Sequence, residues 1–104
     1  MAICIVDLST GQSFNQDFIY DSTQLSAEWV VERPDVNNAL SNIANFGSVT
    51  LSNCTVKMDN EVGALGYFVS VRIFMYDANG TRLADVSSYD DDGSSFKVTY
   101  LTSQ

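Results

Sequence analysis

Short runs of strand-forming residues, separated by turn residues, follow one another along almost the whole chain. The runs cover residues 2–8, 12–20, 26–33, 48–56, 67–76, 81–88 and 94–101, and in several of them apolar and polar side chains alternate. Alternation with a period of two is typical of strands, and about seven short runs at this spacing indicate an antiparallel β-sandwich. The sequence therefore predicts an all-β fold with two sheets in one domain that covers residues 1–104.

Two stretches between the runs lack this alternation. Residues 35–46 space Val36, Leu40 and Ile43 as a helix would, but the asparagines between them favour a loop with at most one helical turn. Residues 58–66 also read as a loop. By contrast, Asn79-Gly80 predicts a tight hairpin, because these residue types accept the positive φ that such a turn requires.

Charge and composition exclude several classes of function. The 13 acidic and 5 basic residues give a net charge of -8, which disfavours binding to nucleic acid and to an anionic membrane surface. No apolar run is long enough to span a membrane, and the first residues lack the basic start of a signal peptide. Histidine is absent, which excludes Ser-His-Asp and Cys-His catalysis and most zinc sites. Any hydrolysis must rest on carboxylates, amides, hydroxyls or a hard metal.

The run at residues 26–33 places a carboxylate beside the only tryptophan of the chain. Because strand side chains alternate between faces, Trp29 points to the core with Ala27 and Val31, and Glu28 points to the opposite face. A half-buried carboxylate in this position is either a catalytic group with a raised pKa or a structural acid with a partner.

Glu32 lies on the same face as Glu28 but does not form a catalytic pair with it. Four residues of strand separate their backbones by roughly 13 Å. Paired glycosidase carboxylates lie only about 5 to 9.5 Å apart. With Arg33 and Pro34 beside it at the strand end, Glu32 is interpreted as a surface acid.

The run at residues 67–76 predicts the strongest strand of the chain. Its odd-numbered positions are apolar, whereas its even-numbered positions mix aromatic side chains with a serine and an arginine. The mixed face fits a concave substrate groove lined by Phe68, Arg72, Phe74 and Tyr76. It fits equally a second apolar layer in which Arg72 is paired with a carboxylate.

The cysteines and the acidic run near the C-terminus have simpler interpretations. Cys4 and Cys54 either form one disulfide in an oxidising compartment or are two small buried residues. Residues 90–94, DDDGS, offer oxygens to Ca²⁺ but lack the ligand spacing of an EF-hand, so a solvated acidic turn is favoured. We expect no metal and no cofactor.

Four segments of the chain resemble the fungal-type glutamic peptidases (the eqolisins, family G1). Residues 27–32, AEWVVE, resemble the A-E-W-I-V-E segment of that family. The other three are residues 7–12, DLSTGQ, similar to N-L-T-T-G-Q; residues 45–51, NFGSVTL, similar to D-F-G-T-V-T-F; and residues 93–100, GSSFKVTY, similar to G-S-S-F-T-V-T-Y. The four matches follow the family's order and cover the C-terminal half of its domain.

The resemblance implies a secreted, acid-active endopeptidase that cleaves polypeptides and has a double-sheet sandwich of the jelly-roll or concanavalin-like kind. It implies that Glu28 is the general base that activates water and then protonates the leaving amine, with Trp29 as structural support. In that family, a glutamine polarises the scissile carbonyl and stabilises the oxyanion. The extracellular location rests on the resemblance alone.

The family domain is much longer than this chain, and its catalytic glutamine belongs to the part with no counterpart here. The glutamines present are Gln12, Gln16, Gln24 and Gln104, and none stands in the surroundings of that motif. Three alternatives follow. The chain joins a complementary half-domain, it pairs with a second copy as a homodimer, or it has lost catalysis and is a β-sandwich module that binds peptide or carbohydrate.

Overall fold

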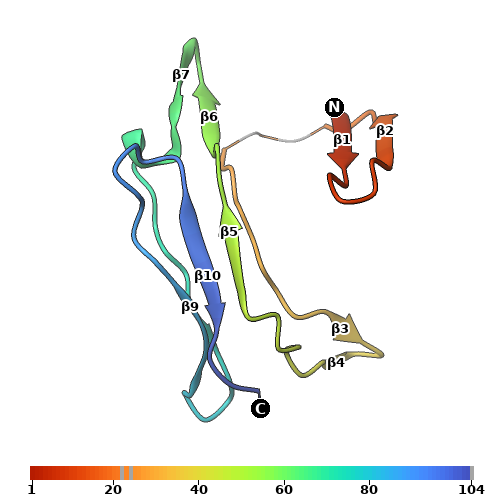
Figure 1. Cartoon of the computed structure of the whole chain (residues 1–104), viewed down its shortest axis with the longest axis vertical. Helices are drawn as coiled ribbons and strands as arrows, with labels where there is room; N and C mark the ends of the chain where they lie inside the picture. The colour runs from red at the N-terminus through yellow and green to blue at the C-terminus, as the bar shows by residue number, and fades with distance from the viewer. Residues whose placement is uncertain (22, 24, 104) are drawn as a thin grey trace.

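The computed structural model describes residues 1–21, 23 and 25–103, and nearly all of its regular structure is antiparallel β (Figure 1). The elements are β1 (Ala2–Val6), β2 (Ser13–Asp17), β3 (Asp35–Val36), β4 (Ala39–Leu40), β5 (Ser48–Leu51), β6 (Thr55–Met58), β7 (Glu61–Ala64), the single 3-10 turn η1 (Leu65–Tyr67), β8 (Met75–Tyr76), β9 (Arg82–Val86) and β10 (Phe96–Tyr100). The all-β, antiparallel class predicted from the sequence is confirmed.

The strands form one four-stranded sheet and three separate hairpins. The sheet has the order β5-β10-β9-β8, and the hairpins are β1-β2, β3-β4 and β6-β7. Val98 of β10 lies at the centre of the sheet, opposite Val49 on one side and Val86 on the other. The strand order describes one larger sheet and three hairpins, and the predicted two-sheet sandwich stays a prediction.

The buried core lies on the four-stranded sheet and is small. Leu83 and Ala84 of β9 and Val98 of β10 pack with Ile43 from the loop before β5. Partly buried apolar side chains surround them, among them Val31, Phe46, Leu51, Met75, Val86, Phe96 and Tyr100. Burial of these apolar groups is the main stabilising contribution that the sheet receives.

Residues that accept positive φ form the tight turns. Asn37 and Asn38, with φ of 54° and 63°, are the two turn residues between β3 and β4. Gly80, with φ of 82°, closes the turn between β8 and β9, where the Asp77 carboxylate accepts hydrogen bonds from the backbone N–H of Asn79 and Thr81. The hairpin predicted at Asn79-Gly80 is confirmed.

Residues 35–46 were predicted to be a loop with at most one helical turn. They form the short β3-β4 hairpin followed by a loop, and they contain no helical turn.

A close approach of two glycines joins the β6-β7 hairpin to the sheet. The N–H of Gly66 donates to the carbonyl of Gly93 at 2.8 Å, and a Cβ on Gly66 would lie 3.1 Å from the Gly93 backbone. Beside them, the N–H of Cys54 donates to the carbonyl of Ser94, and the carbonyl of Cys54 accepts from Leu65. Only residues without a side chain allow the two backbones to come this close.

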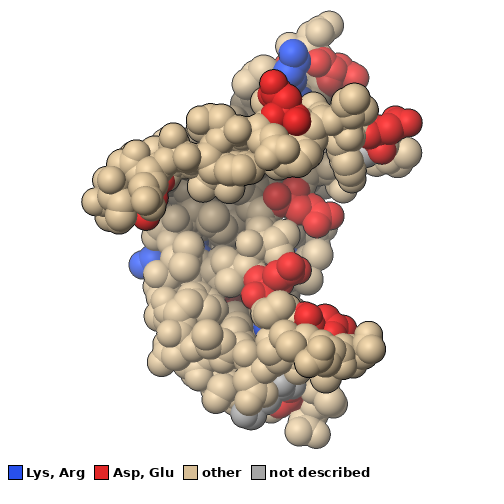
Figure 2. Space-filling model, turned by 90° about the vertical axis from the view of Figure 1, so that its right-hand side faces the viewer, with Lys and Arg blue, Asp and Glu red and all other residues tan. Residues whose placement is uncertain are grey.

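The chain is more open than a complete domain of its size. Its radius of gyration is 16.0 Å, whereas a compact chain of this length has a radius of about 13 Å. Its accessible surface is 8294 Å², against about 5,800 Å² for a compact monomer of this mass. The β1-β2 hairpin stands away from the sheet, and one face is hollowed between projecting arms (Figures 1 and 2). No helix in the described part of the chain is long and apolar enough to cross a membrane.

Predicted elements differ from the observed ones in four places, one of which is the run at residues 48–56, expected as one strand but divided between β5 and β6. Residues 26–33 and most of residues 67–76 were expected to be strands, but only Met75 and Tyr76 pair in a ladder. Residues 58–66 were expected to be a loop, but they contain β7 and lead into η1. A strand is defined by its hydrogen-bonded neighbour, and residues 26–33 and 68–74 have no such neighbour among the described residues.

Leu83→Ala is expected to lower the free energy of unfolding by about 2 to 5 kcal/mol, because it leaves a cavity in a small core. The Leu83 side chain has 0% of its surface exposed. The matched control is Ile19→Ala, at a side chain that is fully exposed, and its effect should stay within about 0.5 kcal/mol. Urea denaturation followed by Trp29 fluorescence measures both variants. Equal losses would contradict the location of the core.

Candidate functional site

Glu28 lies on a long extended segment, residues 25–34, that leads from the β1-β2 hairpin to β3. Along it, Trp29 and Val31 are half-buried, while Glu28 is exposed. Val31 packs against the core cluster. The predicted alternation therefore holds for these three residues, whereas Ala27, expected on the core face, is exposed.

Contacts near Pro34 hold the end of this segment. The N–H of Ser41 donates to the carbonyl of Pro34 at 3.0 Å, and Nη1 of Arg33 donates to the carbonyl of Ser41 at 3.4 Å. The segment is thus fixed to the loop after β4, and Glu28 is positioned six residues before that anchor. Glu32 is exposed, as expected for a surface acid.

The environment of Glu28 differs from the prediction in its burial. A half-buried carboxylate was expected, but the Glu28 side chain is exposed and makes no ion pair with another described residue. The physical reason is that residues 25–33 have no neighbouring strand in the described chain, so nothing covers the face on which Glu28 lies. Among the described residues, Glu28 is neither buried nor paired with a cation, and its catalytic role stays a prediction.

No glutamine of the described chain is positioned by the sheet that carries the core. Gln12 follows the turn after β1, and Gln16 lies in β2 opposite Ile3. Both therefore belong to the hairpin that stands away from the sheet (Figure 1). Gln24 and Gln104 lie outside the described residues.

Two of the residues predicted to line a groove, Phe74 and Tyr76, contact arginine side chains. The guanidinium of Arg82 lies over the Phe74 ring at 4.2 Å and donates to the Tyr76 hydroxyl, while its Nη1 pairs with Asp85 at 3.1 Å. The guanidinium of Arg72 also lies over the Phe74 ring, 5.7 Å from its centre. Phe68 packs beside Tyr67, with an edge-to-face ring contact at 5.4 Å.

These contacts do not decide between the two interpretations of this face. Arg72 donates to the carbonyl of Val86 at 3.1 Å rather than to a carboxylate. Arg72 was expected to pair with a carboxylate, but the arginine that does so is Arg82, which pairs with Asp85. The sequence analysis did not identify Arg82. Neither of the two hollows found in the structure is lined by Phe68, Arg72, Phe74 or Tyr76, so the groove remains a prediction.

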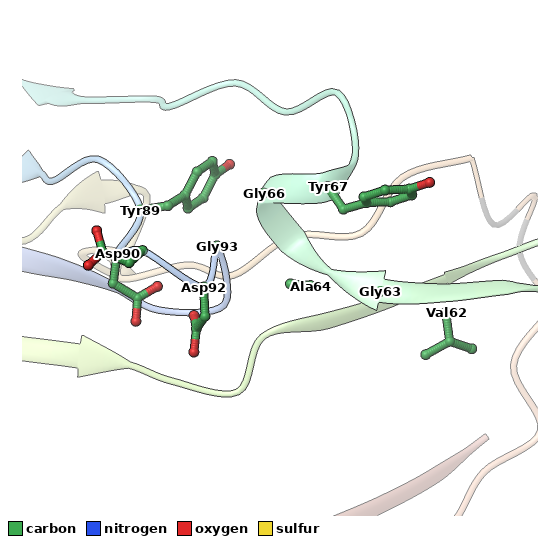
Figure 3. A pocket seen from close by; sticks show the side chains of 10 residues that line it. Val62, Gly63, Ala64, Gly66, Tyr67, Tyr89, Asp90, Asp92 and Gly93 are labelled. Atoms are coloured by element: carbon green, nitrogen blue, oxygen red, sulfur yellow. The ribbon is translucent and has the colours of Figure 1, made fainter.

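A hollow with a volume of about 450 Å³ lies beside the acidic turn before β10. Tyr89, Asp90 and Asp92 reach it from that turn, and Tyr67 reaches it from η1 on the other side of Gly66 (Figure 3). Sequence reasoning missed this hollow, because it depends on the approach of Gly66 to Gly93. The turn itself is the acidic turn that was predicted.

Hydrogen bonds within this turn engage the carboxylates of Asp90 and Asp92. Asp92 accepts from the hydroxyl and the backbone N–H of Ser94, both at 2.7 Å, and Asp90 accepts from the N–H of Ser95 at 3.0 Å. The Ser94 hydroxyl, then the Ser94 N–H and the contact with Asp90, lower the pKa of Asp92 below its usual value. Among the described residues, no three His, Cys, Asp or Glu side chains gather as a metal site would require.

The two cysteines are free thiols that lie in different parts of the structure. Cys54 is buried beside η1, and burial raises the pKa of its thiol. Cys4 is exposed in β1. The alternative of a small buried residue therefore describes Cys54 alone, and the disulfide is not formed in this structure.

Comparisons with known proteins agree with this architecture. Residues 1–100 match the Peptidase A4 family. The structure is similar to the crystal structure of aspergilloglutamic peptidase from Aspergillus niger, with a TM-score of 0.76 and 26% sequence identity. The match covers 96% of this chain and 58% of that chain. No curated protein sequence matched.

The β-rich fold is thus shared with a glutamic peptidase, over a part of its length. The chain belongs to the Peptidase A4 family, whose members are also called eqolisins, so the resemblance seen in the sequence is confirmed. It spans 58% of the relative's chain, and the remaining portion of that chain has no counterpart here.

Ser94→Ala is expected to raise the pKa of Asp92 toward its ordinary value of 3.8, because it removes the hydroxyl that contributes most to the shift. Since the folded-state pKa is lowered, the carboxylate stabilises the fold above the unfolded pKa, and this contribution is lost as the pH falls through the folded pKa. Titration of the carboxyl carbons by NMR measures the change. Ser48→Ala, whose hydroxyl bonds to Thr99 instead, should leave the pKa of Asp92 in place.

Proposed function

We propose that this chain carries the catalytic carboxylate of an acid-active glutamic endopeptidase, with Glu28 as general base and general acid. The observation that carries the proposal is the position of Glu28 in the AEW segment of a Peptidase A4 chain, on the face opposite Trp29 and Val31. The half-buried Trp29 and Val31 hold the backbone that follows Glu28.

The chemistry needs one carboxylate in two protonation states. The Glu28 carboxylate takes a proton from water as the water oxygen bonds to the scissile carbonyl carbon. The protonated Glu28 then delivers that proton to the amide nitrogen as the C–N bond breaks, and an acid and an amine leave. A carboxyl group serves both steps best when its pKa lies near the working pH.

The overall charge of the chain supports activity at acidic pH. The chain has a pI of about 4.1, so the self-repulsion of its carboxylates is largely relieved near that pH. Histidine is absent, which leaves carboxylates as the general bases of the chain. Secretion into an acidic environment is part of the proposal and agrees with this composition.

Among the described residues, no group is identified that would stabilise the oxyanion. Gln12 and Gln16 lie in the β1-β2 hairpin, away from the sheet. Loss of one oxyanion donor typically costs about a hundred- to a thousandfold in rate. The proposal therefore assigns low activity to the chain alone and expects a second polypeptide to supply the amide.

The alternative function is a non-catalytic β-sandwich module that binds peptide or carbohydrate or associates with itself. It is favoured by the exposure of Glu28 and by the open sheet, which leave the catalytic arrangement incomplete. The two functions differ in what they require of Glu28: an enzyme needs its ionisable carboxyl, whereas a binding module does not.

Glu28→Gln is expected to reduce hydrolysis of an unfolded protein substrate at about pH 3 to 5 by a hundredfold or more, because an amide cannot transfer the proton. The release of new amino termini measures the rate, and far-UV circular dichroism checks that the fold is kept. Glu32→Gln is the matched control, since this exposed acid lies on the same segment, and it should retain activity.

Two results would contradict the proposal. One is equal activity of the wild-type chain and Glu28→Gln. The other is the absence of cleavage by a folded wild-type chain both alone and together with the unmatched portion of aspergilloglutamic peptidase. The second result would favour the binding module.

A further inference from the structure

One turn connects the β6-β7 hairpin and η1 to the four-stranded sheet. The N–H of Cys54, just before β6, donates to the carbonyl of Ser94 at 2.8 Å. The N–H of Gly66, in η1, donates to the carbonyl of Gly93 at 2.8 Å. Among the described residues, these are the backbone hydrogen bonds that join residues 54–66 to another part of the chain, and both end on the acidic turn of residues 90–94 (Figure 3). The attachment of the hairpin therefore depends on the shape of this turn.

Two carboxylates support the shape of the acidic turn. Asp92 accepts from the hydroxyl and the N–H of Ser94, both at 2.7 Å, and Asp90 accepts from the N–H of Ser95 at 3.0 Å. The backbone closes the same turn, since the N–H of Gly93 donates to the carbonyl of Asp90. Hydrogen bonds to an ionised acceptor are about twice as strong as those to a neutral one. Protonation of Asp92 therefore weakens the support of Gly93 and Ser94, whose carbonyls bind the hairpin.

The titratable groups around Asp92 are all acids. Those on its own turn or on the elements packed against it, among the described residues, are Asp90, Asp91, Tyr89, Tyr67 and Cys54. No lysine or arginine is among the residues that line the hollow at this turn. Tyrosine and cysteine ordinarily lose their protons above about pH 8, and burial, then the charge of Asp90, raises the pKa of Cys54 further. In acid, therefore, only the carboxylates of the turn change their charge.

Hydrogen bonding outweighs repulsion at Asp92. Repulsion between neighbouring carboxylates would raise its pKa. The Ser94 hydroxyl, then the Ser94 N–H and the contact with Asp90, instead lower the pKa of Asp92 below its ordinary value of 3.8. Since the folded-state pKa is lowered, the ionised carboxylate stabilises the turn above the unfolded pKa, and this contribution is lost as the pH falls through the folded pKa.

We propose that the acidic turn is a pH-sensitive latch for the β6-β7 hairpin and η1. With Asp92 ionised, the turn holds both elements through the carbonyls of Gly93 and Ser94. With Asp92 protonated, the hairpin and η1 separate from the turn, while the four-stranded sheet stays folded. The sheet keeps its apolar core, because residues 90–94 contribute no side chain to that core.

Little buried apolar surface opposes the release of the hairpin. Met58 at the end of β6 is 55% exposed, and Val62 of β7 is 70% exposed. Within residues 54–67, all of which the structure describes, Cys54 is the one buried side chain. Segments with few buried apolar contacts open locally at a lower free energy than the whole chain unfolds. The thiol of Cys54 becomes accessible when the latch opens, so it reports the release.

Labelling of Cys54 tests the latch directly. Cys4→Ser removes the exposed thiol and leaves Cys54 as the single thiol of the chain. Dithiodipyridine, which reacts with thiols in acid, is used from about pH 6 down to about pH 2, with the denatured chain as the reference at each pH. The relative labelling rate should rise about tenfold for each unit by which the pKa of Asp92, measured by NMR, lies below 3.8.

Asp92→Asn, made in the same background, removes the titration but keeps a side-chain oxygen as acceptor. Its labelling should already be raised at about pH 6, and it should change little as the pH falls, because the neutral amide supports the turn less well at every pH. Hydrogen exchange of the backbone amides of β9 and β10 is measured in parallel. Those amides should stay protected in both proteins where Cys54 reacts.

Asp7→Asn is the matched control for a change of charge. Asp7 accepts from the hydroxyl and the N–H of Ser9, at 2.6 and 2.8 Å, in the same pattern as Asp92 with Ser94. The Ser9 hydroxyl, then the Ser9 N–H, lower the pKa of Asp7 as well. Its turn belongs to the β1-β2 hairpin, which pairs with no other described strand, so Asp7→Asn should leave the labelling profile of Cys54 unchanged.

Three results would overturn the latch. The first is a labelling rate that stays constant as the pH falls through the measured pKa of Asp92. The second is an equal effect of Asp7→Asn and Asp92→Asn, which would assign the change to net charge. The third is loss of amide protection in β9 and β10 at the pH where Cys54 becomes reactive, because the hairpin would then unfold with the whole chain.

This inference does not depend on the proposed catalytic function. Thiol labelling and hydrogen exchange need no substrate, and Glu28 lies on residues 25–34, which form no backbone hydrogen bond with the acidic turn among the described residues. Glu28→Gln should therefore keep the labelling profile of the unmodified chain. Failure of the latch leaves the role of Glu28 to its own test, and failure of catalysis leaves the latch untouched.

Discussion

The hydrogen-bonding needs of extended backbone determine most features of this structure. A strand leaves its N–H and C=O groups unpaired until a neighbour lies beside it. Residues 25–33 and 68–74 are extended but have no such neighbour among the described residues. The large accessible surface, the exposed side chains of Val69, Val71 and Ile73 and the exposure of Glu28 follow from this shortage of partners.

The part of the chain that is well packed is the part in which pairing is complete. β9 and β10 each have neighbours on both sides, and three of the buried apolar residues, Leu83, Ala84 and Val98, lie on them. The contact between Gly66 and Gly93 extends this region to the β6-β7 hairpin. Val31 packs against the same core, so the segment that carries Glu28 is supported on its Trp29 side and uncovered on the other.

The sequence predicts local features better than it predicts partners. Alternation in residues 2–8, 81–88 and 94–101 correctly predicted β1, β9 and β10, and Asn79-Gly80 correctly predicted a turn. Both signals depend only on residues that are close in the sequence. The same alternation predicted strands at residues 26–33 and 67–76. Their side-chain faces are largely as expected, but a ladder also needs a neighbour, and nothing in the pattern of one segment shows whether the chain contains it.

The candidate site shows the same division between local and long-range information. The AEW segment identified Glu28 and its orientation relative to Trp29, which depends on strand alternation alone. The burial of Glu28 could not be predicted, because it depends on residues far away or in another polypeptide. The hollow at Tyr89 and Tyr67 was missed for a similar reason, since it arises where Gly66 meets a turn 27 residues later in the chain.

Completion of the fold and the proposed chemistry are linked through the same face. A carboxyl group that acts as base and then as acid benefits from partial removal from water, which needs a surface to cover it. Glu28 lacks that cover because its segment lacks a neighbouring strand. A strand placed beside residues 25–33 would satisfy the backbone and cover Glu28 at once.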